Sequence, residues 1–333
     1  MKVNHVWYGD NALGPLELFN IYSWLALGHE VTIYAHKWDG SDHNAGSLKV
    51  DSAVKIKSLD TILTKDDEKE KSALMPNTRA LLKAWIAATN KKKPDTDLIF
   101  NLVDVTKSYI GGTRQGIVLD LKAGPSKHLA SDYEAVFGKK FISYTRGGNT
   151  VLPENQCMGT MDGEKSAIRG KYAAYFESKV TKSLEDFTKN PTKAWFGLIT
   201  VFHGEAFRAT GAGIDVATQA PGGAKLKADQ FVVEEIGEPS HGPFRIFKHK
   251  ADQTNKSGSI KTKPADIADL AQKTYDKELK VASGVKDAFL KKAEAAMKTL
   301  PEWKAPKPKE KCEACGLEVA NMKAHKFECK GKK

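Results

Sequence analysis

The opening of the chain restricts its fold more than any other stretch, because a strand pattern, a helix pattern and a second strand pattern follow one another within 35 residues. Residues 3–8 (VNHVWY) are mostly apolar and end at Gly9, and Pro15 suits the first turn of a helix that runs to about Leu27. Residues 30–35 (EVTIYA) are rich in β-branched side chains and form the second expected strand. This βαβ order predicts an α/β fold.

The end of the first expected strand is a candidate ligand site, since α/β units place the loops at the carboxyl ends of their strands over a crevice. Trp7, Tyr8 and Gly9 stand at this point and are candidates to contact a flat ring or a phosphate. No Gly-x-Gly-x-x-Gly motif follows, which argues against a dinucleotide-binding Rossmann site. The alternative is that the two aromatic side chains belong to the hydrophobic core.

A second candidate site lies in residues 101–126 (NLVDVTKSYIGGTRQGIVLDLKAGPS). Asp104 and Lys107 are one helical turn apart, and a short apolar strand over residues 117–119 delivers Asp120 to a turn at a Gly-Pro pair. Lys122 brings positive charge to the same turn. A glycine-rich break is expected between the two halves of the stretch, at Gly111, Gly112 and Gly116.

The remaining patterns extend the α/β interpretation along the chain. Helices are expected at residues 78–89, 172–187, 264–279 and 285–300, the last two as a hairpin packed on the main domain. Further strands are expected at residues 97–102, 140–150, 195–203 and 229–236. The strand that begins at residue 140 leads into a glycine-rich turn, which continues through residues 152–160. The charged run at residues 65–71 predicts an exposed helix or loop.

Four segments in this order resemble the nucleotide-sugar glycosyltransferases of the GT-A fold: VWYG, PLELFNIYSWLALGHEVTIYAHK, DVTKSYIGG and GIVLDLKAGP. The resemblance points to the group that contains the large clostridial toxin transferase domains and capsule-type transferases with an Asp-x-Asp motif. It covers residues 2–126 of the chain. It implies a Rossmann-like mixed sheet flanked by helices, and transfer of a sugar from a UDP-sugar donor to a hydroxyl group.

The same resemblance assigns roles to single residues. Asp104 matches the acid that holds hydroxyl groups of the donor sugar, Lys107 takes the place of a helix arginine, and Asp120 matches the first acid of the Asp-x-Asp motif. Lys122 replaces the second acid, and its ammonium group cannot ligate the Mn²⁺ or Mg²⁺ that the motif normally binds. A lysine is instead expected to neutralise the departing diphosphate, so transfer should need little or no divalent cation. The alternative is a degenerate fold that acts as a nucleic-acid-binding or sugar-binding module.

Three further groups of polar residues are candidates for the same site. Arg146 and Glu154 lie in a polar stretch that suits contacts with phosphate and sugar groups, with a plain surface loop as the alternative. His203 and Glu205 follow the most apolar expected strand, where they are candidates for acid–base work, with a structural histidine as the alternative. The general base stays open between Glu154, His203 and Glu205. A late basic segment resembles the loop that closes over the diphosphate in these transferases, and it contains His241, Arg245 and Lys248.

The C-terminal end carries the most specific motif of the chain, C-x2-C-x9-H-x3-C. Its spacing is that of a tetrahedral zinc site in which the protein fills all four positions, so the Zn²⁺ is expected to be structural. The expected ligands are Cys312, Cys315, His325 and Cys329. The sequence is therefore divided into a GT-A domain over residues 1–255, the helical hairpin over 264–300, a basic linker over 301–311 and a zinc module over 312–333.

The charge of the whole chain points to an acidic partner, because 52 Lys and Arg residues against 41 Asp and Glu residues give a formal net charge of +11. Together with a basic zinc module, this favours duplex DNA with a 5-hydroxymethylcytosine-type base as acceptor, as in the phage-type transferases that the chain resembles in overall make-up. A protein or polysaccharide acceptor is the alternative. Since the sequence has neither a long apolar run nor a basic leader, we expect a cytoplasmic protein, in the host cytoplasm for a phage, with no membrane partner.

Overall fold

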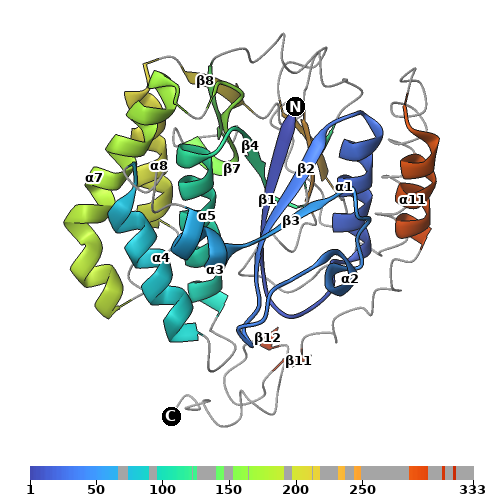
Figure 1. Ribbon diagram of the computed structural model, residues 1–333, viewed down its shortest axis with the longest axis horizontal. Helices are drawn as coiled ribbons and strands as arrows, with labels where there is room; N and C mark the ends of the chain where they lie inside the picture. The colour runs from blue at the N-terminus through green and yellow to red at the C-terminus, as the bar shows by residue number, and fades with distance from the viewer. Residues whose placement is uncertain are drawn as a thin grey trace.

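The computed structural model describes residues 1–66, 74–89, 96–121, 123–125, 140–145, 153–163, 165–190, 197–211, 213–217, 232–236, 244–248, 285–298, 310–311 and 318–319. These residues form a mixed α/β fold with a central sheet between two layers of helices (Figure 1). None of the described helices combines the length and the apolar character needed to cross a lipid bilayer.

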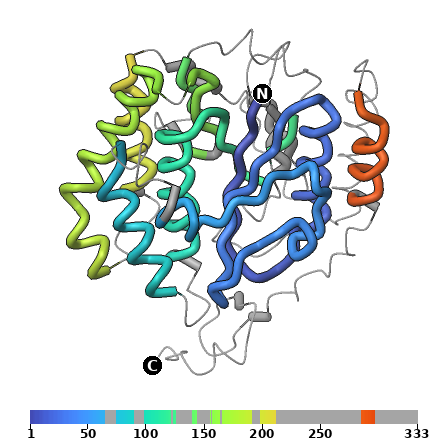
Figure 2. The backbone as a smooth tube through the Cα atoms, in the orientation of Figure 1, coloured from blue at the N-terminus to red at the C-terminus, as the bar shows by residue number. Residues whose placement is uncertain are grey.

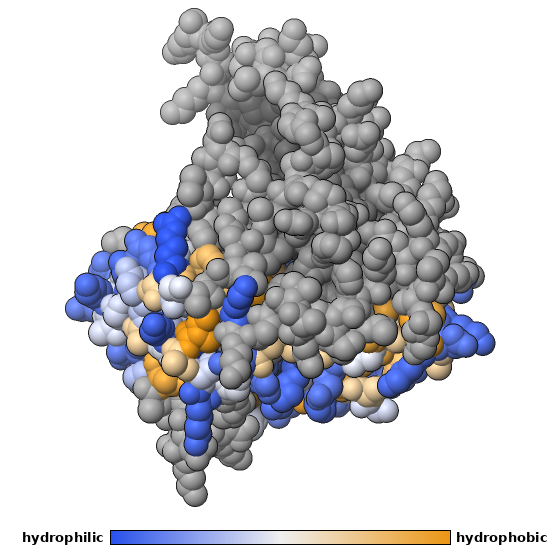
Figure 3. Space-filling model, turned by 90° about the horizontal axis from the view of Figure 1, so that it is seen from above, coloured by the Kyte–Doolittle hydropathy of each residue, from blue (hydrophilic) through white to orange (hydrophobic). Residues whose placement is uncertain are grey.

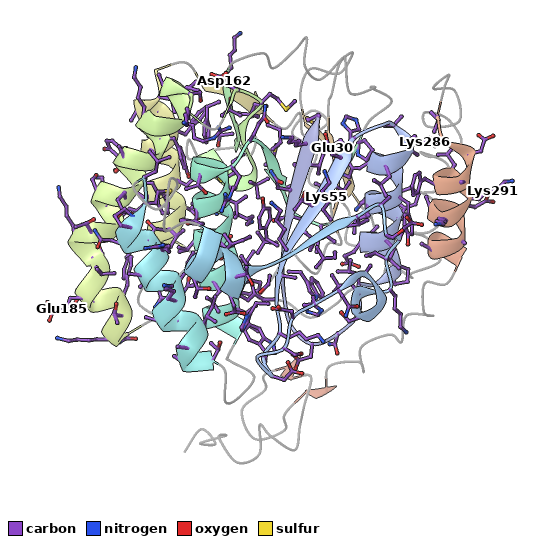
Figure 4. The ribbon with its side chains drawn as sticks, in the orientation of Figure 1. Glu30, Lys55, Asp162, Glu185, Lys286 and Lys291 are labelled. Carbon is purple, nitrogen blue, oxygen red and sulfur yellow. The ribbon has the colours of Figure 1, made fainter. Side chains whose placement is uncertain are left out.

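The central sheet is seven-stranded in the described residues, with the order β3-β2-β1-β4-β7-β6-β8. The strands β3, β2, β1 and β4 are parallel, whereas β7 runs antiparallel to both of its neighbours and β8 is parallel to β6. Glu30 of β2 and Lys55 of β3 pair across this parallel part at 2.8 Å (Figure 4). The bounds are β1 (Lys2–Tyr8), β2 (Glu30–His36), β3 (Lys55–Ser58), β4 (Gly116–Leu119), β6 (Phe141–Thr145), β7 (Pro153–Thr160) and β8 (Gly213–Ala217).

Helices cover both faces of the sheet (Figures 1 and 2). One face carries α4 (Pro76–Thr89), α5 (Thr96–Thr113), α7 (Ala167–Lys189) and α8 (Gly197–Ala209), and the other carries α1 (Pro15–Ala26) and α11 (Asp287–Lys298). Alternate residues of β1 face opposite layers, so Val3 joins the core under α1 while Val6 joins the core under α4 and α5. Short helices are α2 (Ala45–Leu48), α3 (Leu59–Thr61) and the π-helix η1 (Ile62–Asp66). The predicted α/β fold with a βαβ opening is confirmed.

A second, antiparallel sheet has the order β5-β10-β9, with β5 (Ala123–Pro125), β9 (Val232–Ile236) and β10 (Phe244–Lys248). Two short strands, β11 (Glu310–Lys311) and β12 (Glu318–Val319), pair antiparallel with each other. Seen from above, the described part of the surface is mostly hydrophilic, and its hydrophobic areas are smaller (Figure 3).

Two of the expected strands are helices. Residues 97–102 belong to α5, and the residues of 195–203 that the structure describes belong to α8. Both stretches bury side chains at helical spacing, as Leu102, Val105 and Tyr109 do in α5. Each stretch also has an apolar side chain on its exposed face, Phe100 and Leu198, so the sequence shows no polar–apolar alternation that separates a strand from a helix, which is why the strand prediction was wrong. Residues 153–160, expected to continue a turn, form β7.

The expected break at Gly111 and Gly112 is also wrong, because both glycines lie inside α5. Their role is close packing. A Cβ on Gly111 would lie 2.6 Å from Met158 Cε, and one on Gly112 would lie 2.7 Å from Met75 Sδ. The glycines therefore let α5 approach β7 and the start of α4 rather than end the helix.

The helix expected at residues 285–300 is confirmed as α11, which packs along α1. The ring of Phe289 stacks on Tyr22 with centroids 6.4 Å apart, and Lys292 pairs with Asp51. Lys291 lies on the same helix, and Lys286 directly precedes it (Figure 4). The first helix of the predicted hairpin, residues 264–279, lies outside the described residues.

Candidate functional site

The candidate site lies where β4 leaves the sheet. The parallel strands β1, β2, β3 and β4 end at the same edge, which is where α/β sheets bind their ligands. Asp120 directly follows β4, and α5 packs on β4 and β1 beside it. The fold therefore brings Asp120 to the edge that the βαβ opening predicts.

Lys107 joins two carboxylates at this edge. Its Nζ atom lies 2.7 Å from Asp120 Oδ1 and 3.2 Å from Asp104 Oδ1. The side chain of Lys107 is 4% exposed, that of Asp104 is 15% exposed and that of Asp120 is 34% exposed. We refer to Asp104, Lys107 and Asp120 as the acid–lysine cluster; with two carboxylates and one ammonium group it carries a net negative charge and opens to solvent on the Asp120 side.

The electrostatics of the acid–lysine cluster follow from its burial. Burial alone would lower the pKa of Lys107, but the charges of Asp120 and Asp104 outweigh it and raise that pKa, so the ammonium group stays charged. Burial raises the pKa of Asp104, and Lys107 opposes this effect. Lys107 therefore offsets part of the negative charge of the two acids.

Neighbouring polar groups fix α5 next to the strands. Asn155 of β7 donates from Nδ2 to the carbonyl oxygen of Asp104 at 3.1 Å. The hydroxyl groups of Tyr8 and Thr106 form a 2.8 Å hydrogen bond between β1 and α5. Asn155 belongs to the polar stretch that the sequence predicts for substrate contacts, and its buried position in β7 brings it next to α5.

The loop after β1 is joined to the loop after β2. Gly9 has φ +135°, a conformation that side chains rarely adopt, and its N–H donates to the carbonyl oxygen of His36. His43 Nε2 lies 2.6 Å from the carbonyl oxygen of Gly9. Tyr8 is buried and stacks on Trp38 with ring centroids 5.7 Å apart, so it belongs to the core, as the alternative interpretation expects. Trp7 stays partly exposed at the sheet edge.

His203 is a core residue of α8 and does not follow a strand. Its Nε2 lies 2.8 Å from Ser143 Oγ, and its Nδ1 lies 2.9 Å from the hydroxyl oxygen of Tyr172. Burial, helped by the charge of Lys107, lowers the pKa of His203 to about 3. A neutral, fully buried imidazole between two hydroxyl groups fits a structural role rather than the predicted acid–base role.

Glu205, also on α8, pairs with Lys179 of α7 at 2.5 Å. The hydroxyl group of Tyr175 lies 3.5 Å from the same carboxylate oxygen. The hydrogen bond from Lys179 lowers the pKa of Glu205. These partners tie α7 to α8 and do not include the acid–lysine cluster.

Of the other expected site residues, three lie in strands and the rest lie outside the described residues. Glu154 lies in β7 opposite Tyr144 of β6. Arg245 and Lys248 lie in β10, and Arg245 stands opposite Gly124 of β5, so this basic strand runs next to the turn after Asp120. Outside the described residues lie Lys122, Arg146, His241, Cys312, Cys315, His325 and Cys329.

Comparison with known proteins gives no family for this chain. No protein-family model matches it, and no curated protein matches its sequence. Two similar solved structures are the PaToxG glycosyltransferase, with 12% identity and a TM-score of 0.39 over 62% of this chain and 67% of that one, and the ligand-free glycosyltransferase domain from the YGT toxin, with 8% identity and a TM-score of 0.39 over 64% and 79%. With TM-scores below 0.5, neither structure defines the activity of this chain.

Proposed function

We propose that this chain is a glycosyltransferase that moves a sugar from a UDP-sugar donor to a hydroxyl acceptor. The observation that carries the proposal is the acid–lysine cluster at the end of β4. In the sequence resemblance, Asp104 matches the acid that holds hydroxyl groups of the donor sugar, Lys107 takes the place of the helix arginine and Asp120 matches the first acid of the Asp-x-Asp motif. They come from a helix and a strand end, and the fold brings them into direct contact at a ligand-binding edge.

Each member of the cluster has a role that its geometry supports. The carboxylates of Asp104 and Asp120 are proposed to accept hydrogen bonds from sugar hydroxyl groups, and carboxylates form the stronger, charge-assisted type of bond. Lys107 holds both carboxylates in place, so little reorganisation is needed when the sugar binds. Trp7, near the end of β1, is the proposed contact for the uracil ring. The strand with Arg245 pairs with β5 beside the turn after Asp120, where the diphosphate is proposed to lie.

The charge on the departing diphosphate is proposed to be balanced by protein cations. The donor set does not suit Mn²⁺ or Mg²⁺, because Asp120 Oδ1 already accepts from Lys107 and Lys122 has no lone pair to offer. Among the residues that the structure describes, no three His, Cys, Asp or Glu side chains gather closely enough to hold a metal ion. Lys122, two residues after Asp120, is the proposed counter-charge.

Neutralising either acid tests the site directly. Asp104→Asn and Asp120→Asn are each expected to lower the rate of UDP-sugar hydrolysis by about 100-fold, because amides lose the charge-assisted bonds to the sugar. Release of UDP from a panel of UDP-sugars is the measurement. Asp51→Asn is the matched control, since Asp51 pairs with Lys292 of α11 and should leave hydrolysis unchanged. Full hydrolysis by Asp120→Asn would overturn the proposal.

A hydroxymethylated base in duplex DNA is the proposed acceptor, supported by the net charge of +11 and the basic C-terminal region. We expect a hexose on 5-hydroxymethylcytosine DNA but not on unmodified DNA, when each is incubated with protein, UDP-sugars and EDTA and its nucleosides are analysed by mass spectrometry. Transfer that requires Mn²⁺ would contradict the role proposed for Lys122. Donor hydrolysis without transfer to DNA would favour a protein or polysaccharide acceptor.

The C-terminal cysteines and histidine are proposed to hold a structural Zn²⁺. In support, β11 and β12 pair antiparallel, and the first two cysteines of the motif lie between these strands in the sequence. About one zinc per chain is expected by elemental analysis. Removing it with a strong chelator should weaken duplex DNA binding while UDP-sugar hydrolysis persists. Full zinc content in Cys312→Ser would contradict the assignment, and Cys157→Ser, at a buried thiol in β7, is the control.

A further inference from the structure

The turn that carries Asp120 is held from the α1 side by three side chains. Each side chain donates an N–H group to a backbone carbonyl oxygen, and the three acceptors are every second residue from Leu119 to Ala123. The hydrogen bonds run from His5 Nδ1 to Leu119 (2.8 Å), from Asn20 Nδ2 to Leu121 (2.9 Å) and from Trp24 Nε1 to Ala123 (3.0 Å). We call His5, Asn20 and Trp24 the carbonyl clamp. Because a carbonyl oxygen only accepts, the proton of His5 sits on Nδ1.

The carbonyl clamp acts beyond the point where β1 stops pairing with β4. The pairing of β1 with β4 ends at Asn4 and Val118, one residue before Leu119. Beyond that point the β1 backbone no longer pairs with this segment. The turn closes with a bond from the Ala123 N–H to the Asp120 carbonyl oxygen at 2.8 Å. The clamp thus continues the support of the strand through the turn that presents Asp120.

Two members of the clamp each carry a buried polar atom without a partner in the described part of the chain. His5 Nε2 and Asn20 Oδ1 are buried, and neither has a hydrogen-bond partner in the part of the chain that the structure describes. Burying an unpaired polar atom destabilises a fold, so each of these two side chains carries a cost beside the hydrogen bond that it donates. What the polar side chains provide in return is a fixed position for the backbone on both sides of Asp120.

We propose that the carbonyl clamp positions the Asp120 carboxylate against Lys107 and the donor sugar. None of the three clamp residues touches the acid–lysine cluster with its own donor atoms; they act through the backbone of the turn. The proposal rests on the proposed function, because it names what aligns one of the sugar-binding groups of that site.

Trp24→Phe tests the clamp, and Trp85→Phe is its matched control. Both tryptophans are buried and donate from Nε1 to a backbone carbonyl oxygen, Trp85 to that of Phe187 at 2.9 Å on the opposite face of the sheet. Both variants should lose similar stability. Only Trp24→Phe should lower kcat for UDP-sugar hydrolysis, by about tenfold, with KM changed by less than about twofold, because the clamp contacts no substrate. Equal kcat values in the two variants would overturn the proposal.

A conservative exchange at His5 separates positioning from packing. Asparagine carries its Nδ2 donor where histidine carries Nδ1, whereas leucine fills space without a donor. His5→Asn should therefore recover most of the kcat that His5→Leu loses. Identical kcat values for these two variants would contradict the clamp.

Hydrogen exchange provides a readout that does not depend on activity. In Trp24→Phe, the amides of the turn after Asp120 should exchange at least about tenfold faster than in the wild type, and in Trp85→Phe they should not. If the wild type hydrolyses no UDP-sugar, the proposed function fails. The hydrogen-exchange rates still test whether the carbonyl clamp holds the turn after Asp120. Unchanged exchange in Trp24→Phe overturns the clamp, whatever the activity.

Discussion

Lys107→Met is expected to abolish UDP-sugar hydrolysis and to lower the free energy of unfolding by about 3 kcal/mol. Methionine fills a similar volume but leaves Asp104 and Asp120 facing each other without a cation. Removing one partner from a buried ionic group is costly because the remaining charge stays buried and uncompensated. Urea denaturation at pH 7.5 measures the stability, and UDP release measures the activity.

Lys292→Met is the control for this variant. Lys292 also pairs with an aspartate, Asp51, but its side chain is 45% exposed, so the loss should stay within about 1 kcal/mol. The loss of stability in Lys107→Met should be smaller at pH 5, because without Lys107 the pKa of the buried Asp104 rises further and this carboxyl group takes up a proton. Similar stabilities of the two variants at both pH values would show that the acid–lysine cluster is not a coupled ionic group.

Lowering the pH from 7.5 to 5 is expected to cost about 4 kcal/mol of stability through two buried histidines, about 2 kcal/mol each. Burial lowers the pKa of His5 to about 4 and that of His203 to about 3, from an ordinary value of 6.5. The unfolded chain therefore binds more protons than the folded one below pH 6.5. Their stabilising contribution is complete above pH 6.5 and is lost as the pH falls towards 4 for His5 and 3 for His203.

His203→Leu isolates one half of this effect. Its stability difference between pH 7.5 and pH 5 should be smaller than that of the wild type by about 2 kcal/mol, because leucine does not titrate. Phe207→Leu, a core change on the same helix, should lower stability at both pH values and keep the wild-type difference. Urea denaturation at the two pH values is the measurement. An unchanged difference in His203→Leu would mean that His203 is not neutral in the core.

The candidate site was partly predictable from sequence for a local reason. Asp104 and Lys107 are one turn apart on a helix, and Asp120 follows a short apolar strand, so their spacing alone placed them near one strand end. The carbonyl clamp was not predictable in the same way. His5, Asn20 and Trp24 lie in apolar stretches that read simply as core, and their partners are about 100 residues away.

The sequence by itself determined the βαβ opening, the helices α4 and α7 and the acid and lysine that meet after β4, because periodicity, caps and turn residues act within a single element. Only the tertiary structure decided which elements meet. It made residues 97–102 a helix, buried His203 between Ser143 and Tyr172, and brought β10 beside the turn after Asp120. These outcomes depend on which apolar faces pack together across the whole chain, and that choice leaves no signal in the pattern of any one segment.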